Sequence, residues 1–358
     1  MKKPRYIVAS LLFLFSTTMF VSTGIAGEYS HYKQHKKSKD RGHMVIANRA
    51  SGSISVIDVR TDKVRSTITL PVSDNPPEPM YVVHSPRADR VFVGDRANNR
   101  IVVFDDNNFE YETSVPAGNG VFHMWADQND EQLWVNNDID KTITVIDPLT
   151  LDVLATVPMP EDLVALGGKP HDVILEPSGH SAFVTIVGIS GENDFVVKFN
   201  TRTFSETARA AVGKDPHVSL TRHNKFLYVA TQNNNAMHIL KRRNLKQVKI
   251  LEIPGAHGLG MARKGRTLYT TNISGGGSEG LFTIDTRKNK IIGQAIDTPF
   301  PTPHNIALTP RGSKLYITHS GAGANQVSVY RINKRSRLPE LETTITVEFN
   351  PFGLAFVR

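Results

Sequence analysis

Short apolar runs separated by polar turns recur along the chain from residue 43 to its end. A run such as FLYVAT (226–231) or KLYITH (314–319) is followed by a polar turn and then by a second run, AMHILK or QVSVYR. Apolar or alternating runs of this length, bounded by turns, are typical of β-strands. No comparable stretch has apolar residues at helical spacing over several turns, so we predict almost no helix.

The same phrase occurs seven times, roughly 45 residues apart, as repeat architectures require. Each copy has a third strand after this second one, and a fourth follows turns such as VRTDK or PLTLD. Four short strands per repeat, seven times over, predict an all-β, seven-bladed β-propeller spanning residues 43–358. The copies of the second strand are HMVIAN (43–48), RVFVGD (90–95), QLWVNN (132–137), SAFVTI (181–186), FLYVAT (226–231), TLYTTN (267–272) and KLYITH (314–319).

The two ends of the repeat region complement each other. The first repeat begins at His43 with its second strand, and the chain finishes with NPFGLAFVR (350–358), which matches a first strand. We therefore predict that the C-terminal strand pairs with the N-terminal blade and closes the ring. Closure of this kind removes open sheet edges.

The repeat, in the form PH, apolar strand, P-x-G, LYVTN, resembles the YVTN family of seven-bladed propellers, which includes periplasmic propellers of the YncE type. The resemblance covers residues 43–358. It implies the fold but no single function, because propellers host binding modules and enzymes alike. More distantly, the chain is similar to the copper-binding propeller of nitrous oxide reductase and the haem-binding propeller of nitrite reductase, and it matches neither pattern fully.

One histidine recurs at the start of the predicted first strand, which lines the channel of a propeller. A residue at one repeat position therefore forms a ring around the axis. After the proline-like turn this ring reads Met80, His123, His171, His217, His257, His304 and Phe352. A second ring, at the last residue of the second strand, reads Asn48, Asp95, Asn137, Ile186, Thr231, Asn272 and His319. We take the histidines of both rings, with Asn48, Asp95, Asn137 and Asn272, as candidate ligand-binding residues.

Imidazole is the commonest protein ligand for copper, zinc and iron, and a thioether suits copper(I). The candidate cofactors are therefore copper, zinc or haem iron, although the haem-attachment pattern C-x-x-C-H is absent. Because metal bonds are about 2.0 Å long, two or three neighbours could share one ion but the whole ring could not. The alternative is structural: each histidine hydrogen-bonds the neighbouring blade. The candidate metal ligands are His171, His217, His257, His304, His123 and Met80.

Three classes of function remain open on this pattern. A binding module for a metal, a cofactor, a small ligand or a protein needs only the funnel. An enzyme, whether hydrolase, lyase or redox, also needs a carboxylate beside a ring histidine, for which Asp95, Asp172 and Asp215 are the candidates. No Ser-His-Asp arrangement can be read from spacing, so we favour the binding module. The third class is a scaffold that binds protein or DNA.

The N-terminus predicts export. Residues 1–26 combine the basic head MKKPR, the apolar run YIVASLLFLF and the small residues STGIAG, as in a signal peptide. We therefore expect a periplasmic, monomeric protein without a transmembrane segment after cleavage. Of the formal charge of +8, residues 1–26 carry +3 and the basic flexible tail at 27–42 another +3, so the propeller is only +2 and nucleic acid is a weak candidate partner. With no cysteine, disulfides and thiolate ligands are excluded.

Overall fold

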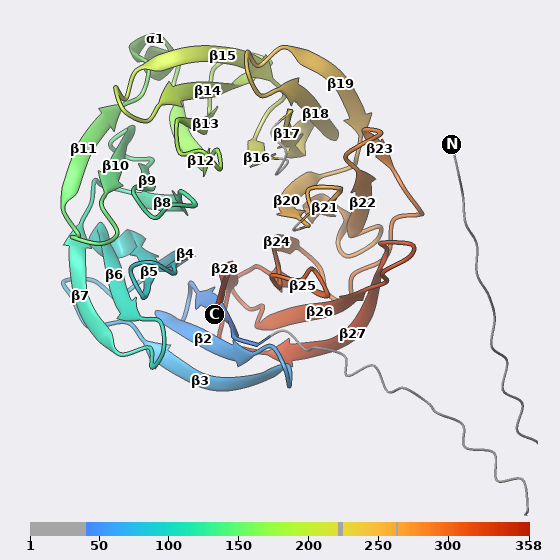
Figure 1. Ribbon diagram of the computed structural model, residues 1–358, viewed down its shortest axis with the longest axis horizontal. Helices are drawn as coiled ribbons and strands as arrows, with labels where there is room; N and C mark the ends of the chain where they lie inside the picture. The colour runs from blue at the N-terminus through green and yellow to red at the C-terminus, as the bar shows by residue number, and fades with distance from the viewer. Residues whose placement is uncertain (1–40, 221–224, 263) are drawn as a thin grey trace, which may run out of the picture. The chain divides into compact units, whose positions relative to one another are not determined.

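The computed structural model describes residues 41–220, 225–262 and 264–358, and within them 28 strands form seven four-stranded antiparallel sheets. The sheets are arranged around a central axis as the blades of a propeller (Figure 1). The predicted all-β, seven-bladed propeller is therefore confirmed. The predicted signal peptide (1–26), and the predicted tail (27–42) up to residue 40, lie outside the described residues.

Each blade runs from an inner strand beside the axis to an outer strand at the rim (Figure 1). Seven copies of one pattern give seven copies of one sheet, because each copy has two apolar strands between an inner and a more exposed outer strand. In order from the axis the blades are β28 (Pro351–Val357), β1 (His43–Asn48), β2 (Ser53–Asp58), β3 (Lys63–Thr69); β4 (Pro79–Ser85), β5 (Arg90–Asp95), β6 (Arg100–Asp105), β7 (Tyr111–Pro116); β8 (Val121–Ala126), β9 (Leu133–Asn137), β10 (Thr142–Ile146), β11 (Val153–Pro158); β12 (Lys169–Leu175), β13 (Ser181–Val187), β14 (Asp194–Asn200), β15 (Glu206–Val212); β16 (Pro216–Leu220), β17 (Phe226–Thr231), β18 (Ala236–Lys241), β19 (Gln247–Glu252); β20 (Ala256–Met261), β21 (Thr267–Asn272), β22 (Leu281–Asp285), β23 (Lys290–Ile291); and β24 (Pro303–Leu308), β25 (Lys314–His319), β26 (Gln326–Ile332), β27 (Pro339–Thr346).

Helix is nearly absent from the described residues, as the sequence predicts. They contain one short α-helix, α1 (Glu161–Ala165), and three 3-10 turns, η1 (Arg96–Asn98), η2 (Gln232–Asn234) and η3 (Ile273–Gly275). None of the helices in this part of the chain has the length and apolar character needed to cross a membrane.

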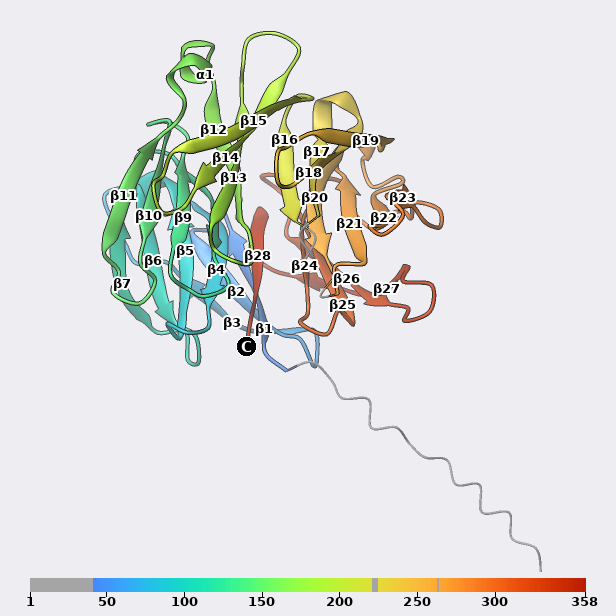
Figure 2. The same cartoon turned by 45° about the horizontal axis from the view of Figure 1, so that its top comes forward.

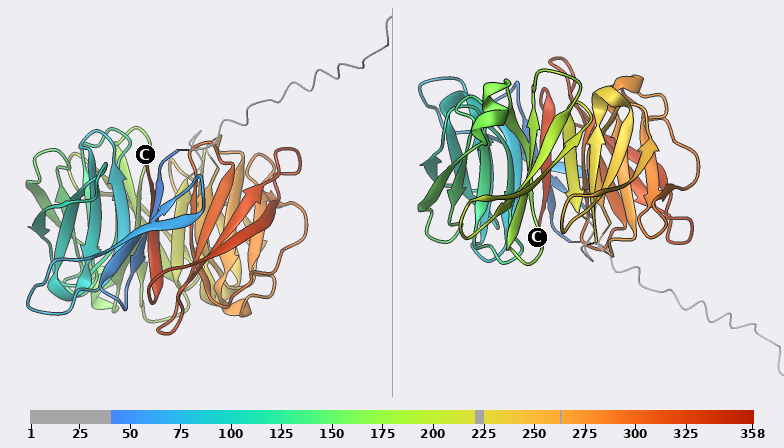
Figure 3. Two further views of the ribbon diagram at one scale, coloured as in Figure 1. Left: turned by 90° about the horizontal axis from the view of Figure 1, so that it is seen from below. Right: turned by 90° about the horizontal axis from the view of Figure 1, so that it is seen from above.

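The predicted ring closure is present. β28 pairs antiparallel with β1, with His43 opposite Val357 and Ile46 opposite Leu354. The first blade is thus assembled from both ends of the repeat region, and Figure 2 shows β28 beside β1 and β2. A side view shows the strands running between two opposite faces, each made of connecting loops (Figure 3). This strand pairing closes the ring in place of a disulfide, because the chain has no cysteine.

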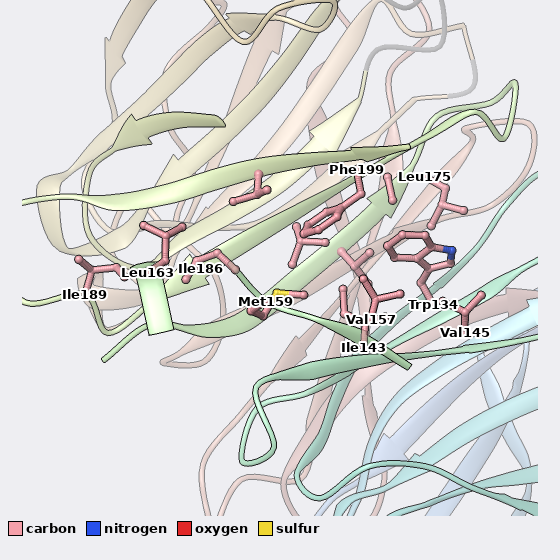
Figure 4. Close-up of a cluster of buried hydrophobic side chains, with 14 residues drawn as sticks. Trp134, Ile143, Val145, Val157, Met159, Leu163, Leu175, Ile186, Ile189 and Phe199 are labelled. Carbon is pink, nitrogen blue, oxygen red and sulfur yellow. The ribbon is translucent and has the colours of Figure 1, made fainter. Parts of the chain in front are cut away.

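The hydrophobic core lies between neighbouring blades. In the cluster of Figure 4, the fully buried Trp134 of one blade packs against Phe199 of the next, with ring centroids 6.2 Å apart. Hydroxyl groups reinforce the contact elsewhere: Tyr269 donates to the carbonyl of Arg337 at 2.8 Å, and Tyr316 donates to the carboxylate of Asp62 across the closure. Each blade therefore shares its apolar face with its neighbours, which fixes the inner strands around the axis.

Candidate metal centre at the propeller axis

An irregularity at the start of the inner strands decides which side chains face the axis. In six of the seven blades the register between inner and second strand shifts near the start of the inner strand, directly after its first residue in five blades and after its second, Pro170, in β12. β16 is the regular exception, with Pro216 opposite Thr231 and His217 opposite Ala230. A β-bulge re-aims the side chains beside it. In six blades the residue after the position that faces the end of the second strand lies at the axis, and in β4 it is Tyr81, two residues after Pro79.

Seven aromatic side chains form a closed ring there. Each contacts the next, with centroids 3.7 to 5.7 Å apart. Four neighbouring imidazoles make one side of the ring, and two phenyl groups and a phenol make the other. In order, the members are Tyr81, Phe122, His171, His217, His257, His304 and Phe352. The structure therefore brings together four of the five histidines of the first predicted ring.

Two predicted ring members are wrong. Val121 occupies the place that proline holds in other blades, since it faces Asn137, so Phe122 and not His123 follows it in the ring. His123 instead accepts a hydrogen bond at Nδ1 from the backbone N–H of Val173, at 3.1 Å. Met80 is fully buried in an apolar cluster between blades, which removes its thioether from the candidate metal ligands.

The second predicted ring lies at the same position of each second strand, and its polar side chains form hydrogen bonds within their own blades. Asn48 donates to Ser55 at 2.9 Å and Asn137 donates to Thr144 at 2.8 Å. Asp95 accepts from Arg100, Asn272 donates to the carbonyl of Ser278, and His319 bonds Ser328. All five are buried. These contacts hold the blades, while the buried amide oxygens of Asn48, Asn137 and Asn272 have no hydrogen-bond partner among the described residues, so their candidate ligand-binding role stays a prediction.

Three donor atoms converge on one side of the axial ring. His171 Nε2 lies 3.5 Å from Asp215 Oδ1, and His217 Nε2 lies 3.7 Å from the same oxygen. All three donor atoms lie within 4.8 Å of one another. Asp215 has a left-handed backbone (φ 58°), and its backbone N–H donates a hydrogen bond of 2.9 Å to the carboxylate of Asp194. We call His171, His217 and Asp215 the axial trio.

A fourth residue orients the trio from behind. Asp172 Oδ2 lies 3.3 Å from His217 Nδ1 and accepts the backbone N–H of Val218, also at 3.3 Å. A carboxylate on one imidazole nitrogen fixes the proton there and turns the lone pair of the other nitrogen outward. His217 Nε2 is buried and has no hydrogen-bond partner among the described residues. Asp172 therefore directs that lone pair toward the other two members of the trio.

The ring histidines differ in their protonation. Burial alone would lower the pKa of His217, but the negative charge of Asp172 and its hydrogen bond raise it above the ordinary 6.5. Burial, followed by repulsion from His217, lowers the pKa of His171 to about 4 and that of His304 to about 3. His217 is thus the ring histidine whose pKa is raised, and a metal at its Nε2 would displace any proton bound there.

The donor set fits a divalent transition metal. Zinc and copper(II) accept imidazole nitrogen and carboxylate oxygen, and tetrahedral bonds of about 2.0–2.1 Å place ligand atoms about 3.3 Å apart. The separations of 3.5 and 3.7 Å in the trio approach that value. His257 and His304 lie in the ring but outside the trio, and His304 Nδ1 instead takes a hydrogen bond of 2.9 Å from Asn305.

Comparison with known proteins places the fold in a family. The family model named Lactonase, 7-bladed beta-propeller matches residues 26–254, more than half of the chain. The chain belongs to this lactonase propeller family. Uncharacterized protein YncE of Escherichia coli O157:H7 is 25% identical over 250 residues, 66% of this chain and 69% of YncE. The resemblance to YncE-like propellers stated from the repeat is therefore confirmed.

Solved structures share the lactonase propeller fold at low sequence identity. The periplasmic gluconolactonase PpgL of Pseudomonas aeruginosa is 16% identical with a TM-score of 0.69, over 88% of this chain and 99% of that one. Hydrazine synthase of Kuenenia stuttgartiensis is 14% identical with a TM-score of 0.62, over 87% and 98%. Likeness at this level concerns the fold alone.

Several residues at the axis are not apparent in the repeat. Tyr81 and Phe122 complete the ring, and Arg49 and Arg96 lie over its phenyl groups. Phe122 could be found by counting from the residue that faces the last position of the second strand. The arginines carry a weaker signal: each directly follows the last residue of a second strand.

Proposed function

We propose that this propeller is a periplasmic binding module that holds one divalent transition metal, zinc or copper, at the axial trio. The observation that carries the proposal is the orphaned Nε2 of His217. This buried nitrogen lacks a hydrogen-bond partner among the described residues, yet it lies 3.7 Å from Asp215 and its other nitrogen faces Asp172. A buried polar atom without a partner costs about 1–3 kcal/mol. A metal ion would satisfy it.

The surroundings of the trio support this function in two ways. His171 has a pKa of about 4 and is therefore neutral at pH 7, as a metal ligand must be. Three protein ligands also leave a coordination position open, as in sites that take water or a substrate on the metal. The trio is thus suited to holding an ion together with a further ligand.

The test is a zinc titration of the full chain, purified from the periplasm and stripped with a chelator. We expect one zinc per chain in the wild type at pH 8, and at least tenfold weaker binding in His217→Gln and Asp215→Asn. His304→Gln is the matched control, because His304 is equally buried in the ring but outside the trio. Failure of the wild type to bind zinc, or equal binding by all four proteins, would refute the proposal.

A second candidate is hydrolysis of a lactone, which membership of the lactonase propeller family favours. Neutral His171 and the carboxylate of Asp215, 3.5 Å apart, would orient a water and accept its proton. Assays of gluconolactone hydrolysis by wild type and Asp215→Asn decide this candidate. A rate equal to that of buffer, or an unchanged rate in the variant, would exclude it.

Export remains a proposal that is supported by the character of residues 1–26. Fractionation of cells that express the full chain tests it, with recovery of a shortened protein from the periplasm as the expected result. A protein partner at the loop face and a DNA contact through the basic tail are the weaker alternatives, since the propeller itself is nearly neutral.

A further inference from the structure

Two arginines share the axial face with the trio. Arg49 follows β1 and Arg96 follows β5, whereas Asp215 directly precedes β16. The end of each second strand lies opposite the start of an inner strand, as Asn48 faces Pro351 and Thr231 faces Pro216. Both guanidinium groups and the trio therefore belong to the same end of the propeller.

Both guanidinium groups lie over the phenyl side of the axial ring. The guanidinium carbon of Arg49 lies 5.4 Å from the centroid of the Phe352 ring, and that of Arg96 lies 5.8 Å from the centroid of the Phe122 ring. The two phenyl groups are 6.2 Å apart. Phe122 also stacks on His171 of the trio at 4.8 Å. A single aromatic ring thus separates a cationic side chain from a candidate metal ligand.

Carboxylates of the same face hold both arginines, and Arg96 also donates through Nη1 to the carbonyls of Gly120 and Val121 at 3.2 and 3.5 Å, so each guanidinium keeps part of its donors for another ligand. Arg49 contacts Glu78 through Nε and Nη2, at 2.6 and 2.5 Å, and Arg96 contacts Asp138 through Nη2 at 2.8 Å. A guanidinium has five N–H donors in a planar fork that matches a carboxylate. With 33% and 21% of their side chains exposed, both arginines are partly open to solvent. They are therefore positioned in advance for an anion.

An open position on the metal and the free N–H donors of the two arginines together favour an anionic oxygen ligand. A divalent ion bound by two neutral imidazoles and one carboxylate keeps one positive charge, which the Asp172 carboxylate behind His217 offsets, and its open position accepts an oxygen ligand. Arg49 and Arg96 lie over the ring, whereas Lys169 and Lys214 of the same face pair with Asp138 and Asp194. Attraction is strong in a partly buried site, where screening by water is weak.

We propose that the metal-loaded site takes a small dicarboxylate, with one carboxylate on the metal and the other on Arg49 and Arg96. This inference rests on the proposed metal site and adds the class of its ligand. The dicarboxylate would lie across the axial ring, from the imidazole side to the phenyl side. A bidentate bond between arginine and carboxylate supplies both affinity and orientation.

The experiment uses the full chain, first titrated with zinc alone and then, zinc-loaded, with succinate, malonate or acetate. We expect the dicarboxylates to bind at least tenfold more tightly than acetate, and only when zinc is present. Arg49→Gln and Arg96→Gln should weaken dicarboxylate binding at least tenfold and change zinc affinity by less than twofold. Arg90→Gln is the matched control, because Arg90 is also paired with a glutamate, Glu112 at 2.8 Å, but at the opposite end of its blade.

The outcomes separate the two proposals. Zinc binding without tighter dicarboxylate binding, or dicarboxylate binding that is equal in all arginine variants, would overturn this inference and leave the metal site standing. No zinc binding by the wild type would overturn both. Arg49→Lys is a conservative variant that keeps the positive charge but lacks the planar N–H donors of the guanidinium, and it guards against a folding defect. If the folded variant binds the dicarboxylate more weakly, the proposal is supported. If it binds like the wild type, the role of the guanidinium donors is contradicted.

Discussion

Replacement of Asp172 by asparagine tests how the trio is oriented. Asp172 is buried, and its carboxylate lies 3.3 Å from His217 Nδ1 and also accepts the backbone N–H of Val218. Asparagine has nearly the same shape and can keep the bond to Val218, but it carries no charge. The variant therefore removes mainly the electrostatic hold on His217.

The expected loss follows from the role of Asp172 behind a ligand. Removing a hydrogen-bonded partner of a ligating histidine costs about 10- to 100-fold in metal affinity, or about 1.4–2.7 kcal/mol. The protonation of His217 adds a pH signature, because a metal must displace that proton. Asp172 raises the pKa of His217 above 6.5, so wild-type zinc affinity should fall as the pH drops through that raised value. In Asp172→Asn burial prevails, the pKa of His217 falls, and the decline moves to lower pH.

The assay is a zinc titration of wild type and Asp172→Asn at pH values from 8 to 5.5. We expect the variant to bind 10- to 100-fold more weakly at pH 8 and the difference to shrink as the pH falls. Circular dichroism checks that the variant is folded. Equal affinity at pH 8, together with the same pH dependence in both proteins, would refute the role assigned to Asp172.

Three further predictions concern stability, measured by urea unfolding of the metal-free protein. In Gly258→Ala the new Cβ would lie 1.8 Å from the carbonyl oxygen of His304, so we expect the free energy of unfolding to fall by about 1–3 kcal/mol or more. In the control Gly323→Ala the new Cβ meets no atom within 4 Å, and stability should change by less than about 0.5 kcal/mol. Equal losses in the two variants would contradict the close approach at Gly258. Tyr316→Phe removes the hydroxyl that donates to the Asp62 carboxylate across the ring closure, for an expected loss of about 1.5–3 kcal/mol, and a variant as stable as the wild type would show that this bond contributes nothing. Burial lowers the pKa of His304 to about 3, so below pH 6.5 the unfolded chain takes up a proton that the folded one does not; stability should fall between pH 6.5 and 4, less steeply in His304→Gln, and identical slopes would contradict this assignment.

The architecture could be predicted from sequence because its signals are local and repeated seven times. The second strands at 43–48, 90–95, 226–231, 267–272 and 314–319 have the predicted bounds. Apolar alternation and turn residues determine such strands within a few neighbours. The pairing of β28 with β1 followed from the missing first strand of the first repeat.

The site could be predicted only in part, because two features depend on contacts outside the repeat. The shift at the start of the inner strands exchanges His123 for Phe122, and side-chain packing draws Met80 into the apolar core in favour of Tyr81. Asp215 was a candidate carboxylate, but its approach to His171 depends on a left-handed backbone and on the bond to Asp194, which no spacing rule specifies.

The most direct test of the central claim is the position of the metal. Crystals of the protein soaked in zinc should give one anomalous peak at the zinc edge, about 2.0–2.2 Å from His171 Nε2, His217 Nε2 and an Asp215 oxygen. The account predicts that this peak disappears in crystals of Asp215→Asn or His217→Gln and persists in His304→Gln. A wild-type map without density between these three side chains, or with zinc ligated only by surface residues, would contradict it.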